Sequence, residues 1–376
     1  MSGHHPHKIV KEFYRIEFKD VNLNSSDDVK NYLLSVGWKP TEWNYKQKNG
    51  RDVYDDRGEK IKTSPKLTED SFDSVKGDIP KLVTRYNILK HRKSMLSNYN
   101  KKAKEWRGLI NLVREDGRIP AEGIPQATNT GRYRHKKIVN IPAARAVYGM
   151  ELRNLFTVPD DKVFVGIDAS GLEARMQAHY VYTYPGGEEY ANELIDGDIH
   201  TKNAEIFKTD RDGAKSPYYA LIYGAQPKKL SETIGCSLKV AEIIWNDFWE
   251  GNPSLKSFRD DCVAEYKKHG FIVGLDGRKI SCRSEHSLVN AKFQSAGSIV
   301  VKTATKYCMQ WVKEAGLDAK LAIHMHDEFN AEVLPIHVDM YCMFAERAFE
   351  LAGEHFNLNI PIVGECKTGK TWGEIH

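Results

Sequence analysis

Two short apolar runs, each ending at acidic residues, constrain the fold of this chain more than any other feature of its sequence. Val163-Phe-Val-Gly-Ile-Asp168 is rich in β-branched residues, so we expect a buried strand that ends at an aspartate. Leu321-Ala-Ile-His-Met325 predicts another strand, and residues 329–334 can return beside it across the polar turn His326-Asp327-Glu328. Residues 188–269, between the two runs, have a mostly helical pattern. The sequence therefore predicts an α+β fold, in which a sheet carries the acids and a large helical insertion divides it.

The other elements are expected on both sides of this core. An amphipathic helix is expected near Ser26–Val36, and residues 79–110 predict one long basic helix. Residues 116–145 hold many turn-forming glycines and prolines. At the C-terminal end we expect a helix at 337–354 and a strand near Ile360–Cys366.

Composition excludes several classes of protein. The chain has 376 residues and is 41% hydrophobic, which is enough for a sizeable core and for more than one compact unit. It has no apolar run long enough to span a membrane, and its N-terminus lacks the apolar centre of a signal peptide. Its six cysteines form no C-x-x-C pair, so we expect neither disulfides nor a zinc knuckle, and a cytoplasmic location fits.

Positive charge is concentrated in residues 81–145, although the net charge of the chain is only +4. This segment has 16 Lys and Arg against 4 Asp and Glu. Four aromatic residues are interleaved with them: Tyr86, Tyr99, Trp106 and Tyr133. Basic and aromatic residues in such a mixture can follow a phosphate backbone. A solvated helix face explains the charge equally well.

The strand-end acids offer a candidate metal site. Asp168 would be held by a rigid strand yet reach a cleft, which suits a hard cation, although an aspartate after a strand is more often a helix cap or turn former. Asp327 and Glu328 can face the same site, or simply form a polar turn. Two aspartates on one sheet could hold two Mg²⁺ ions roughly 3.5–4 Å apart, which would activate an attacking hydroxyl and neutralise a leaving phosphate.

A third pattern has cations and aromatic rings at intervals of four residues: Arg211-x3-Lys215-x3-Tyr219-x3-Tyr223-Gly224. This spacing places the four side chains on one broad face of a helix. Arginine and lysine bind phosphate oxygens and tyrosine stacks on a base or sugar, so the face suits a nucleoside triphosphate. The alternative is an amphipathic surface helix with a tyrosine edge. Pro217 interrupts the hydrogen bonding of this helix and can kink it.

These three patterns have the order and spacing of motifs A, B and C of A-family (DNA polymerase I-like) DNA polymerases, which the chain resembles from about residue 20 to residue 376. Other matching segments are Thr130-Gly131-Arg132, Asn140-Ile-Pro142, Asp196-Gly-Asp-Ile-His200-Thr, Leu275-Asp-Gly-Arg278 and Asn290-x3-Gln294-Ser-Ala-Gly297. The pattern is most similar to phage replicative enzymes. The resemblance implies a right-hand polymerase fold with an antiparallel-sheet palm, helical fingers and a short, incomplete helical thumb. It also implies DNA-directed DNA synthesis in phage replication, in the host cytoplasm.

The resemblance also implies a division of the chain: an N-terminal segment 1–64, a thumb 65–114, palm 115–181 and 290–376, and fingers 182–289. No exonuclease motif precedes these parts, so the chain is expected to have no 3′–5′ exonuclease and to begin within the thumb. A separate polypeptide would then supply the exonuclease and the first thumb helix, or act as a processivity factor. A truncated expression product is the alternative.

By resemblance, Asp168, Asp327 and the Ala169 carbonyl would hold two Mg²⁺ ions, for which Mn²⁺ can substitute. Glu328 would be an accessory acid near the primer end, and Lys215 could protonate the departing pyrophosphate.

The resemblance assigns the remaining roles to the nucleotide and to the DNA. His200, Arg211 and Lys215 would hold the triphosphate, Tyr219 would lie near the sugar, Tyr223 near the template base, and Glu173 would block a 2′-hydroxyl. Residues in contact with primer–template DNA would be Arg132, Asn290, Gln294 and His326. A tyrosine at 219, rather than phenylalanine, implies ready incorporation of dideoxynucleotides. His324 is expected to be structural and to point away from His326.

Three other functions compete with DNA synthesis as explanations of these motifs. A single-subunit RNA polymerase shares the aspartates and the cationic helix, but the role that the resemblance gives to Glu173 would leave no room for a ribose hydroxyl. A two-metal nuclease has no need of that helix. A non-catalytic DNA-binding remnant would not need to keep Asp168, Asp327 and Lys215. The segment Gly364–Thr371 matches a P-loop pattern, but too few residues follow it to form the helix that a P-loop requires, and Lys367, Lys370 and Trp372 are expected to pack on the core.

Overall fold

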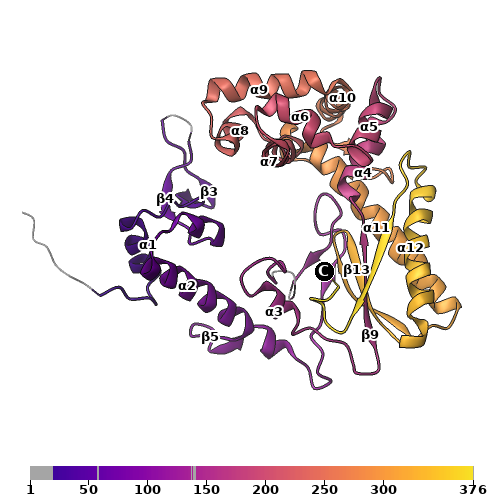
Figure 1. Ribbon diagram of the computed structural model, residues 1–376, viewed down its shortest axis with the longest axis horizontal. Helices are drawn as coiled ribbons and strands as arrows, with labels where there is room; N and C mark the ends of the chain where they lie inside the picture. The colour runs from indigo at the N-terminus through magenta and orange to yellow at the C-terminus, as the bar shows by residue number, and fades with distance from the viewer. Residues whose placement is uncertain (1–19, 57–58, 137, 139–140, 376) are drawn as a thin grey trace, which may run out of the picture. The chain divides into compact units, whose positions relative to one another are not determined.

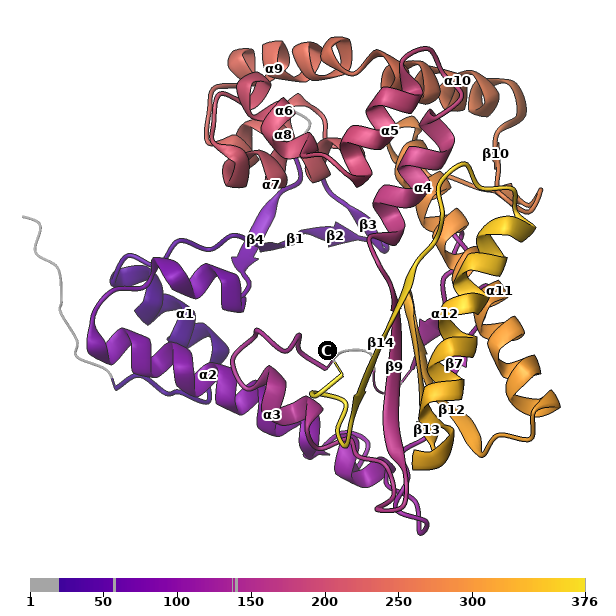
Figure 2. The ribbon, with the colours of Figure 1, turned by 45° about the vertical axis from the view of Figure 1, so that its right-hand side comes forward.

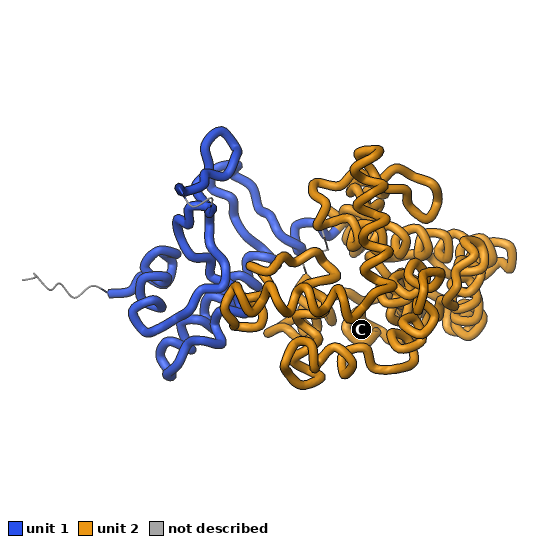
Figure 3. The backbone as a smooth tube through the Cα atoms, turned by 90° about the horizontal axis from the view of Figure 1, so that it is seen from above, with its two compact units in different colours: residues 1–113 blue, residues 114–376 orange. Residues whose placement is uncertain are grey.

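The computed structural model of the protein describes residues 20–56, 59–136, 138 and 141–375 (Figure 1). The chain divides into two compact units, Met1–Val113 and Arg114–His376 (Figure 3).

The first unit is built around two helices and a small apolar core. Helix α1 (Ser26–Ser35) is capped by Ser25, whose side chain accepts a hydrogen bond from the backbone of Asp28, and this helix confirms the prediction near 26–36. Five residues form the core: Val29, Leu33, Trp38, Val75 and Val83. Short strands and a 3₁₀ turn lie between α1 and α2 in the chain: β1 (Trp43–Tyr45), β2 (Gln47–Lys48), β3 (Arg51–Asp52), β4 (Lys62–Pro65) and η1 (Glu69–Ser74).

The long helix predicted for residues 79–110 is wrong beyond its first half. Helix α2 spans Asp78–Leu96, and the chain then forms a hairpin of β5 (Asn98–Asn100) and β6 (Glu105–Arg107), followed by the 3₁₀ turn η2 (Leu109–Leu112). The Asn100 side chain accepts hydrogen bonds from the backbone of Lys102 at 3.0 Å and Ala103 at 3.1 Å, which stabilises a turn in place of a helix. Gly108 has a φ of 109°, and a Cβ there would lie 2.6 Å from the Leu96 carbonyl oxygen, so the close return of the hairpin requires glycine.

A four-stranded antiparallel sheet forms the centre of the second unit, in the order β12-β13-β9-β14. Its strands are β9 (Val163–Ala169), β12 (Ala319–Met325), β13 (Glu328–Val333) and β14 (Gly364–Gly369). Helix α12 (Val338–His355) packs on β9 and β14, and α11 (Leu288–Glu314) packs along α12 (Figure 2). A Cβ at Gly166 would lie 2.8 Å from both Asn330 and Ile375, so the C-terminal residues pack closely on the middle of β9.

The sheet and α12 confirm the sequence prediction with one shift of boundary. The predicted strands at 163–168, 321–325 and 329–334 are present, whereas the last strand begins at Gly364 and not near Ile360. Pro361 precedes it and has no N–H to donate to a neighbouring strand.

The predicted helical middle is present between β9 and β12, where its helices gather together away from the sheet (Figure 1). The helices are α4 (Leu172–Val181), α5 (Gly187–Ile195), α6 (Ile199–Phe207), α7 (Arg211–Ile222), α8 (Pro227–Ile234), α9 (Leu238–Gly251) and α10 (Pro253–His269). Smaller elements complete the unit: β7 (Gly123–Ile124), β8 (Arg134–His135), α3 (Gly149–Arg153), β10 (Ile272–Val273), β11 (Lys279–Ile280), η3 (Glu285–Ser287) and η4 (Pro335–His337). The combination of an antiparallel sheet and a helical insertion confirms the α+β class.

None of the helices in the described part of the chain is both long enough and apolar enough to cross a membrane.

Candidate active site

Strands β9 and β13 bring the two acidic segments to the same end of the sheet. The Ala169 N–H donates a hydrogen bond of 3.0 Å to the Asp327 carbonyl oxygen, and Asp168 lies opposite Glu328 in the register. Because hydrogen-bonded and non-hydrogen-bonded pairs alternate along antiparallel strands, Asp168 and Glu328 form a non-hydrogen-bonded pair, with Cα atoms about 4.5 Å apart and side chains on one face. The Asp168 and Asp327 side chains are exposed. Three acids from two distant segments are therefore neighbours.

Strand β14 adds another acid, Glu365, which lies opposite Asp168 on the other side of β9 and is exposed. The sequence did not single it out, because only the strand pairing places it beside Asp168. Like charges directly opposite one another on a sheet repel. This row of acids is therefore an environment that attracts cations.

Glu328 differs from the two aspartates because it is only 8% exposed. Asn330 donates a hydrogen bond to its Oε1 at 3.3 Å, and the Arg153 guanidinium lies close enough to interact with its charge. Arg153 is itself buried: its Nε donates to the Pro142 carbonyl at 2.9 Å, and its guanidinium lies 4.5 Å from the Trp372 ring centre. Burial lowers the pKa of Arg153, and the charge of Glu328 opposes this shift. No sequence pattern pointed to Arg153, since its partners Pro142, Glu328 and Trp372 come from three separate segments.

Two exposed carboxylates and a backbone carbonyl are a suitable donor set for Mg²⁺. That ion usually binds one or two protein carboxylates and completes its shell with waters and substrate phosphates. Within the described ranges, no group of three His, Cys, Asp or Glu side chains is arranged to hold a metal. The donor set of Asp168, Asp327 and Ala169 thus fits ions that bind together with a phosphate substrate better than a site enclosed by protein.

Helix α7 carries the predicted cationic and aromatic face. The four side chains spaced by four residues are all exposed or half-buried: Arg211, Lys215, Tyr219 and Tyr223. Ala214, Tyr218 and Leu221, on the opposite face, are at most 1% exposed. Asp210 caps the helix by accepting a hydrogen bond of 2.7 Å from the Gly213 N–H. The helix continues without interruption through the buried Pro217, so the four side chains share one face as their spacing predicts.

Acidic residues hold the two cations of α7. The Arg211 Nε donates to the Asp198 carboxylate, and the Lys215 Nζ donates to Asp212 at 2.9 Å. Asp198 also caps α6, by accepting hydrogen bonds from the backbone of His200 at 3.2 Å and Thr201 at 3.3 Å. The hydrogen bonds from Arg211 and Thr201 hold the pKa of Asp198 well below its usual range. The sequence did hold a signal for the contact between Asp198 and Arg211, because Asp198 stands two residues before His200 at the start of a helix.

His200 lies beside the same face of α7. Its ring centre is 5.3 Å from that of Tyr218 and 5.5 Å from that of Tyr219. Burial lowers the pKa of His200, Asp198 opposes the shift, and Lys215 and Arg211 add to it. Its Nδ1 is buried and has no hydrogen-bond partner among the described residues. His200, Arg211 and Lys215 therefore form one cluster.

Glu173 of α4 is joined to the end of α7. The Tyr223 hydroxyl donates a hydrogen bond of 3.0 Å to its Oε2, while its Oε1 is buried without a partner in the described part of the chain. Burial raises the pKa of Glu173, the Tyr223 hydrogen bond and the charge of Arg132 oppose this, and Asp327 adds to it. Burial also raises the pKa of Tyr223 to about 12. The electrostatic effects of Arg132 and Asp327 place both of them near Glu173.

Helix α11 holds the turn that carries Arg132. The Gly131 carbonyl accepts a hydrogen bond of 2.9 Å from the Ser298 hydroxyl and another from the Lys302 ammonium. Gly131 has a φ of 76°, and a Cβ there would lie 2.4 Å from Arg278, so the turn requires glycine. The predicted DNA contacts Asn290 and Gln294 are half-buried, one helical turn apart, on the same helix. Asn140, of the neighbouring predicted segment, lies outside the described residues.

A cluster of aromatic and imidazole rings lies beside the His326 turn. His326 has a φ of 45°, and its ring centre is 6.2 Å from that of His135, while the His324 ring centre is 4.5 Å from that of Tyr133. The prediction that His324 points away from His326 is not supported, because the charge of His326 contributes to the lowered pKa of His324, which places the two rings near one another. Burial lowers the pKa of both histidines, that of His324 to about 4.

The P-loop-like segment is a strand, β14, and no helix follows it in the described residues. Trp372 is fully buried, as predicted. Lys370 is exposed, although its Nζ donates to the Lys162 carbonyl at 2.7 Å, so it is held at the surface and not packed in the core. Lys367 is exposed, so the prediction that it packs on the core is wrong. Its side chain lies on an edge strand, where alternate residues face solvent.

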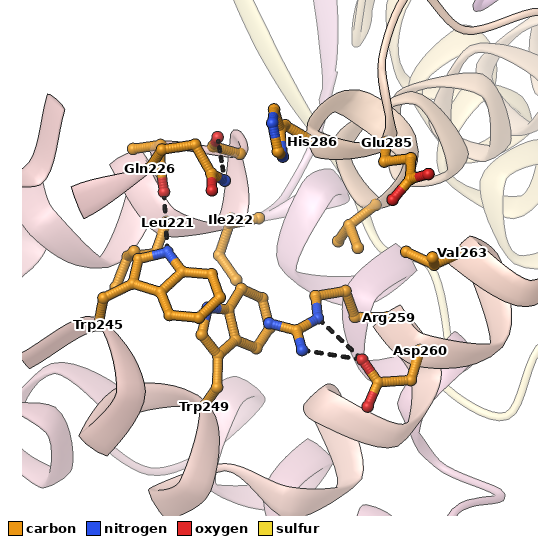
Figure 4. A pocket seen from close by; sticks show the side chains of 13 residues that line it. Leu221, Ile222, Gln226, Trp245, Trp249, Arg259, Asp260, Val263, Glu285 and His286 are labelled. Atoms are coloured by element: carbon orange, nitrogen blue, oxygen red, sulfur yellow. Dashed lines mark hydrogen bonds and ion pairs between the residues drawn. The ribbon is translucent and has the colours of Figure 1, made fainter. Parts of the chain in front are cut away.

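A cavity of about 260 Å³ lies behind the C-terminal end of α7 (Figure 4). The Arg259 guanidinium lies 4.2 Å from the Trp249 ring centre and donates a hydrogen bond of 2.8 Å to Asp260. The Trp245 indole donates to the Ala225 carbonyl at 3.1 Å and so holds the turn after α7. A Cβ at Gly224 would lie 1.9 Å from the His286 carbonyl oxygen, which explains why glycine follows Tyr223.

Comparisons with known proteins agree with one another. The family model described as "DNA polymerase family A" matches residues 2–374. The DNA-directed DNA polymerases of Enterobacteria phage T3 and Escherichia phage T7 are each 28% identical over 96% of this chain and 53% of their own length. DNA polymerase I of Streptococcus pneumoniae serotype 4 is 24% identical over 98% of this chain and 42% of its own. The chain spans about half the length of the curated relatives that it matches.

A solved structure of the POL domain of Pol1 from M. smegmatis, in complex with DNA primer-template and dNTP, superposes with a TM-score of 0.72 at 21% identity. The superposition covers 95% of this chain and 62% of that one, and it shows a shared fold.

Proposed function

The chain belongs to DNA polymerase family A, and from this premise we propose that it is a DNA-directed DNA polymerase that adds deoxynucleotides to a primer 3′-hydroxyl. One observation carries the proposal. The Ala169 N–H donates a hydrogen bond to the Asp327 carbonyl, so the two exposed aspartates lie close together at one end of the sheet, in the same unit as the cationic face of α7. A nuclease would need the acids but has no use for that face.

The proposed metal ligands are the carboxylates of Asp168 and Asp327 and the carbonyl of Ala169. Two Mg²⁺ ions, or Mn²⁺ in their place, would lower the pKa of the primer hydroxyl and offset the charge of the phosphates when bound. Glu328 is too deeply buried and too well paired to serve as a free ligand, and its proposed role is to fix the neighbouring turn through Asn330 and Arg153.

Arg211, Lys215 and His200 are the proposed triphosphate contacts. Asp198 and Asp212 hold the two cations in place, and a triphosphate offers more oxygens than either carboxylate, so it can replace them as the acceptor. Lys215 carries protons on its ammonium group and is the proposed donor to the departing pyrophosphate. His200 offers a buried, unpartnered Nδ1 as a further contact.

Selection of the sugar is assigned to Glu173, Tyr219 and Tyr223. The Tyr223 hydrogen bond fixes the Glu173 carboxylate, which then fills the space beside the proposed sugar and excludes a 2′-hydroxyl. Tyr219 would lie against the sugar, and Tyr223 would lie below the template base.

Primer–template DNA is the proposed second substrate. Its minor groove would be contacted by Arg132, Asn290 and Gln294, all held by or near α11, and His326 would lie at the primer end. The groove offers few differences between base pairs, so these contacts suit an enzyme that must accept every sequence. The proposed division is thumb 65–114, palm 115–181 and 290–376, and fingers 182–289, with phage replication in the host cytoplasm as the proposed setting.

Primer extension tests this function. With Mg²⁺ and deoxynucleotides the chain should extend a primer, and with ribonucleotides, or without a divalent ion, it should not. Asp168→Ala and Asp327→Ala should each abolish extension but keep DNA binding. Glu350→Ala, which removes an exposed acid paired with Arg347 on α12, should leave extension unchanged. Extension by both aspartate variants at the wild-type rate would refute the proposal.

A further inference from the structure

The β5–β6 hairpin exposes two large aromatic rings side by side. Tyr99 and Trp106 are direct cross-strand partners, and their ring centres are 5.3 Å apart. Such pairs stabilise hairpins. Tyr99 is nevertheless 45% exposed and Trp106 62% exposed, so much of each ring is left in water. The contact between the two rings therefore leaves a large aromatic surface exposed to solvent.

The turn between the two strands is strongly cationic. It contains Lys101, Lys102 and Lys104, whose side chains are exposed. None of these lysines forms an ion pair with any described residue, whereas the cation of the strand itself, Arg107, is paired with Glu105 at 2.6 Å. The positive charge of the turn is thus available to an anion.

Hydrogen bonds and a close backbone contact order the hairpin and its connection to α2. The Asn100 side chain orders the turn through its hydrogen bonds to the backbone of Lys102 and Ala103. The close contact of Gly108 with the Leu96 carbonyl holds the returning strand against the end of α2, and Asn111 donates to the Arg107 carbonyl at 3.1 Å. Rings on such a scaffold lose little conformational freedom when they bind a partner.

We propose that this hairpin is a binding site for single-stranded nucleic acid. Aromatic faces stack on bases of any sequence, and lysines beside them bind the phosphates. Bases in a duplex are already stacked and hide their faces, so an unpaired strand is the ligand that uses both features. An acidic peptide would use the lysines alone. The proposal needs none of the residues assigned to nucleotide addition, which lie in the other unit.

The test is the affinity of the full chain for a fluorescein-labelled oligothymidylate, measured by anisotropy. Trp106→Ala should weaken binding by about tenfold, because one stacked base contributes about 1–3 kcal/mol. Trp106→Phe, which keeps an aromatic face, should retain most of the affinity. The triple change Lys101→Gln, Lys102→Gln and Lys104→Gln should reduce the slope of log K against log salt by about 2, as expected for three fewer phosphate contacts on a single strand.

Two competitors and one control separate the alternatives. A blunt duplex should bind equally to wild type and Trp106→Ala. Polyglutamate should displace the oligothymidylate no better from wild type than from Trp106→Ala. Asp168→Ala, which tests catalysis, should bind the oligothymidylate like wild type, so that failure of the polymerase proposal would leave this result unaffected. The inference is overturned if Trp106→Ala and Trp106→Phe both bind as wild type, or if the triple variant keeps its salt slope. It is also overturned if polyglutamate displaces the oligothymidylate from wild type much better than from Trp106→Ala.

Discussion

His324 is a half-buried histidine with buried ring nitrogens, close to the proposed catalytic turn, and its titration should make the second unit sensitive to acid. Its ring packs against Tyr133 and Phe329, and both ring nitrogens lack a partner among the described residues. Burial lowers its pKa to about 4, and the nearby cation Lys302 and the histidines His135 and His326 add to the shift. The folded protein therefore holds His324 neutral.

The direction and size of the effect follow from this pKa. In the unfolded chain the imidazole gains a proton near its ordinary pKa of about 6.5. Because the folded state lowers the pKa of His324, the contribution of the neutral imidazole to folding stability is fully present above the unfolded-state pKa of about 6.5. This contribution is lost progressively as the pH falls from there towards the folded-state pKa of about 4. Between about pH 7.5 and about pH 5.5, the loss from His324 alone is about 1.3 kcal/mol.

Replacement of His324 by phenylalanine tests this reasoning. The variant keeps an aromatic ring in the site and has nothing to protonate, so its free energy of unfolding should fall less than that of wild type on acidification, by about 1.3 kcal/mol. Urea denaturation at the two pH values, followed by tryptophan fluorescence, gives the difference. His269→Gln, at an exposed position, should keep the wild-type pH dependence. Equal pH dependence in wild type and His324→Phe would show that burial does not suppress protonation at this site.

Three further predictions concern the nucleotide site. Asp212→Asn removes an acid that binds Lys215 and Arg211, so KM for deoxynucleotides should fall by up to about fivefold with little change in kcat, and a higher KM would contradict this. Burial raises the pKa of Glu173, so the folded wild type should lose stability as the pH rises through this raised pKa and the carboxyl group ionises. Glu173→Gln cannot ionise and should not show this loss. The difference in thermal stability between the two proteins should therefore be smaller in acid. Tyr219→Phe should reject dideoxynucleotides that wild type incorporates, in a chain-termination assay, and equal rejection by both proteins would disprove a role of the hydroxyl.

Local patterns in the sequence predicted much of the sheet and of the nucleotide helix. Strand β9 was predicted from its β-branched run, and the exposed face of α7 from a spacing of four, because both signals depend on residues close together in the chain. The end of α2 was missed because its basic residues continue the helical pattern beyond Leu96. Asn100 is a local turn signal that the pattern hid, since its side chain bonds the backbone of Lys102 and Ala103. The close approach of Gly108 to the Leu96 carbonyl, in contrast, exists only once the hairpin has folded back on the helix.

The sequence by itself determined the strand-end acids, the cationic helix and the basic segment, since each is a property of composition and period. Tertiary structure alone decided that Asp168 meets Asp327, that Arg153 accompanies Glu328, that Asp198 holds Arg211 and that Tyr223 fixes Glu173. Each of these pairs joins different elements, and strand order and helix packing, not neighbouring residues, bring them together. Burial, which shifts the pKa values of His324 and Glu173, likewise arises only when distant segments pack around a side chain.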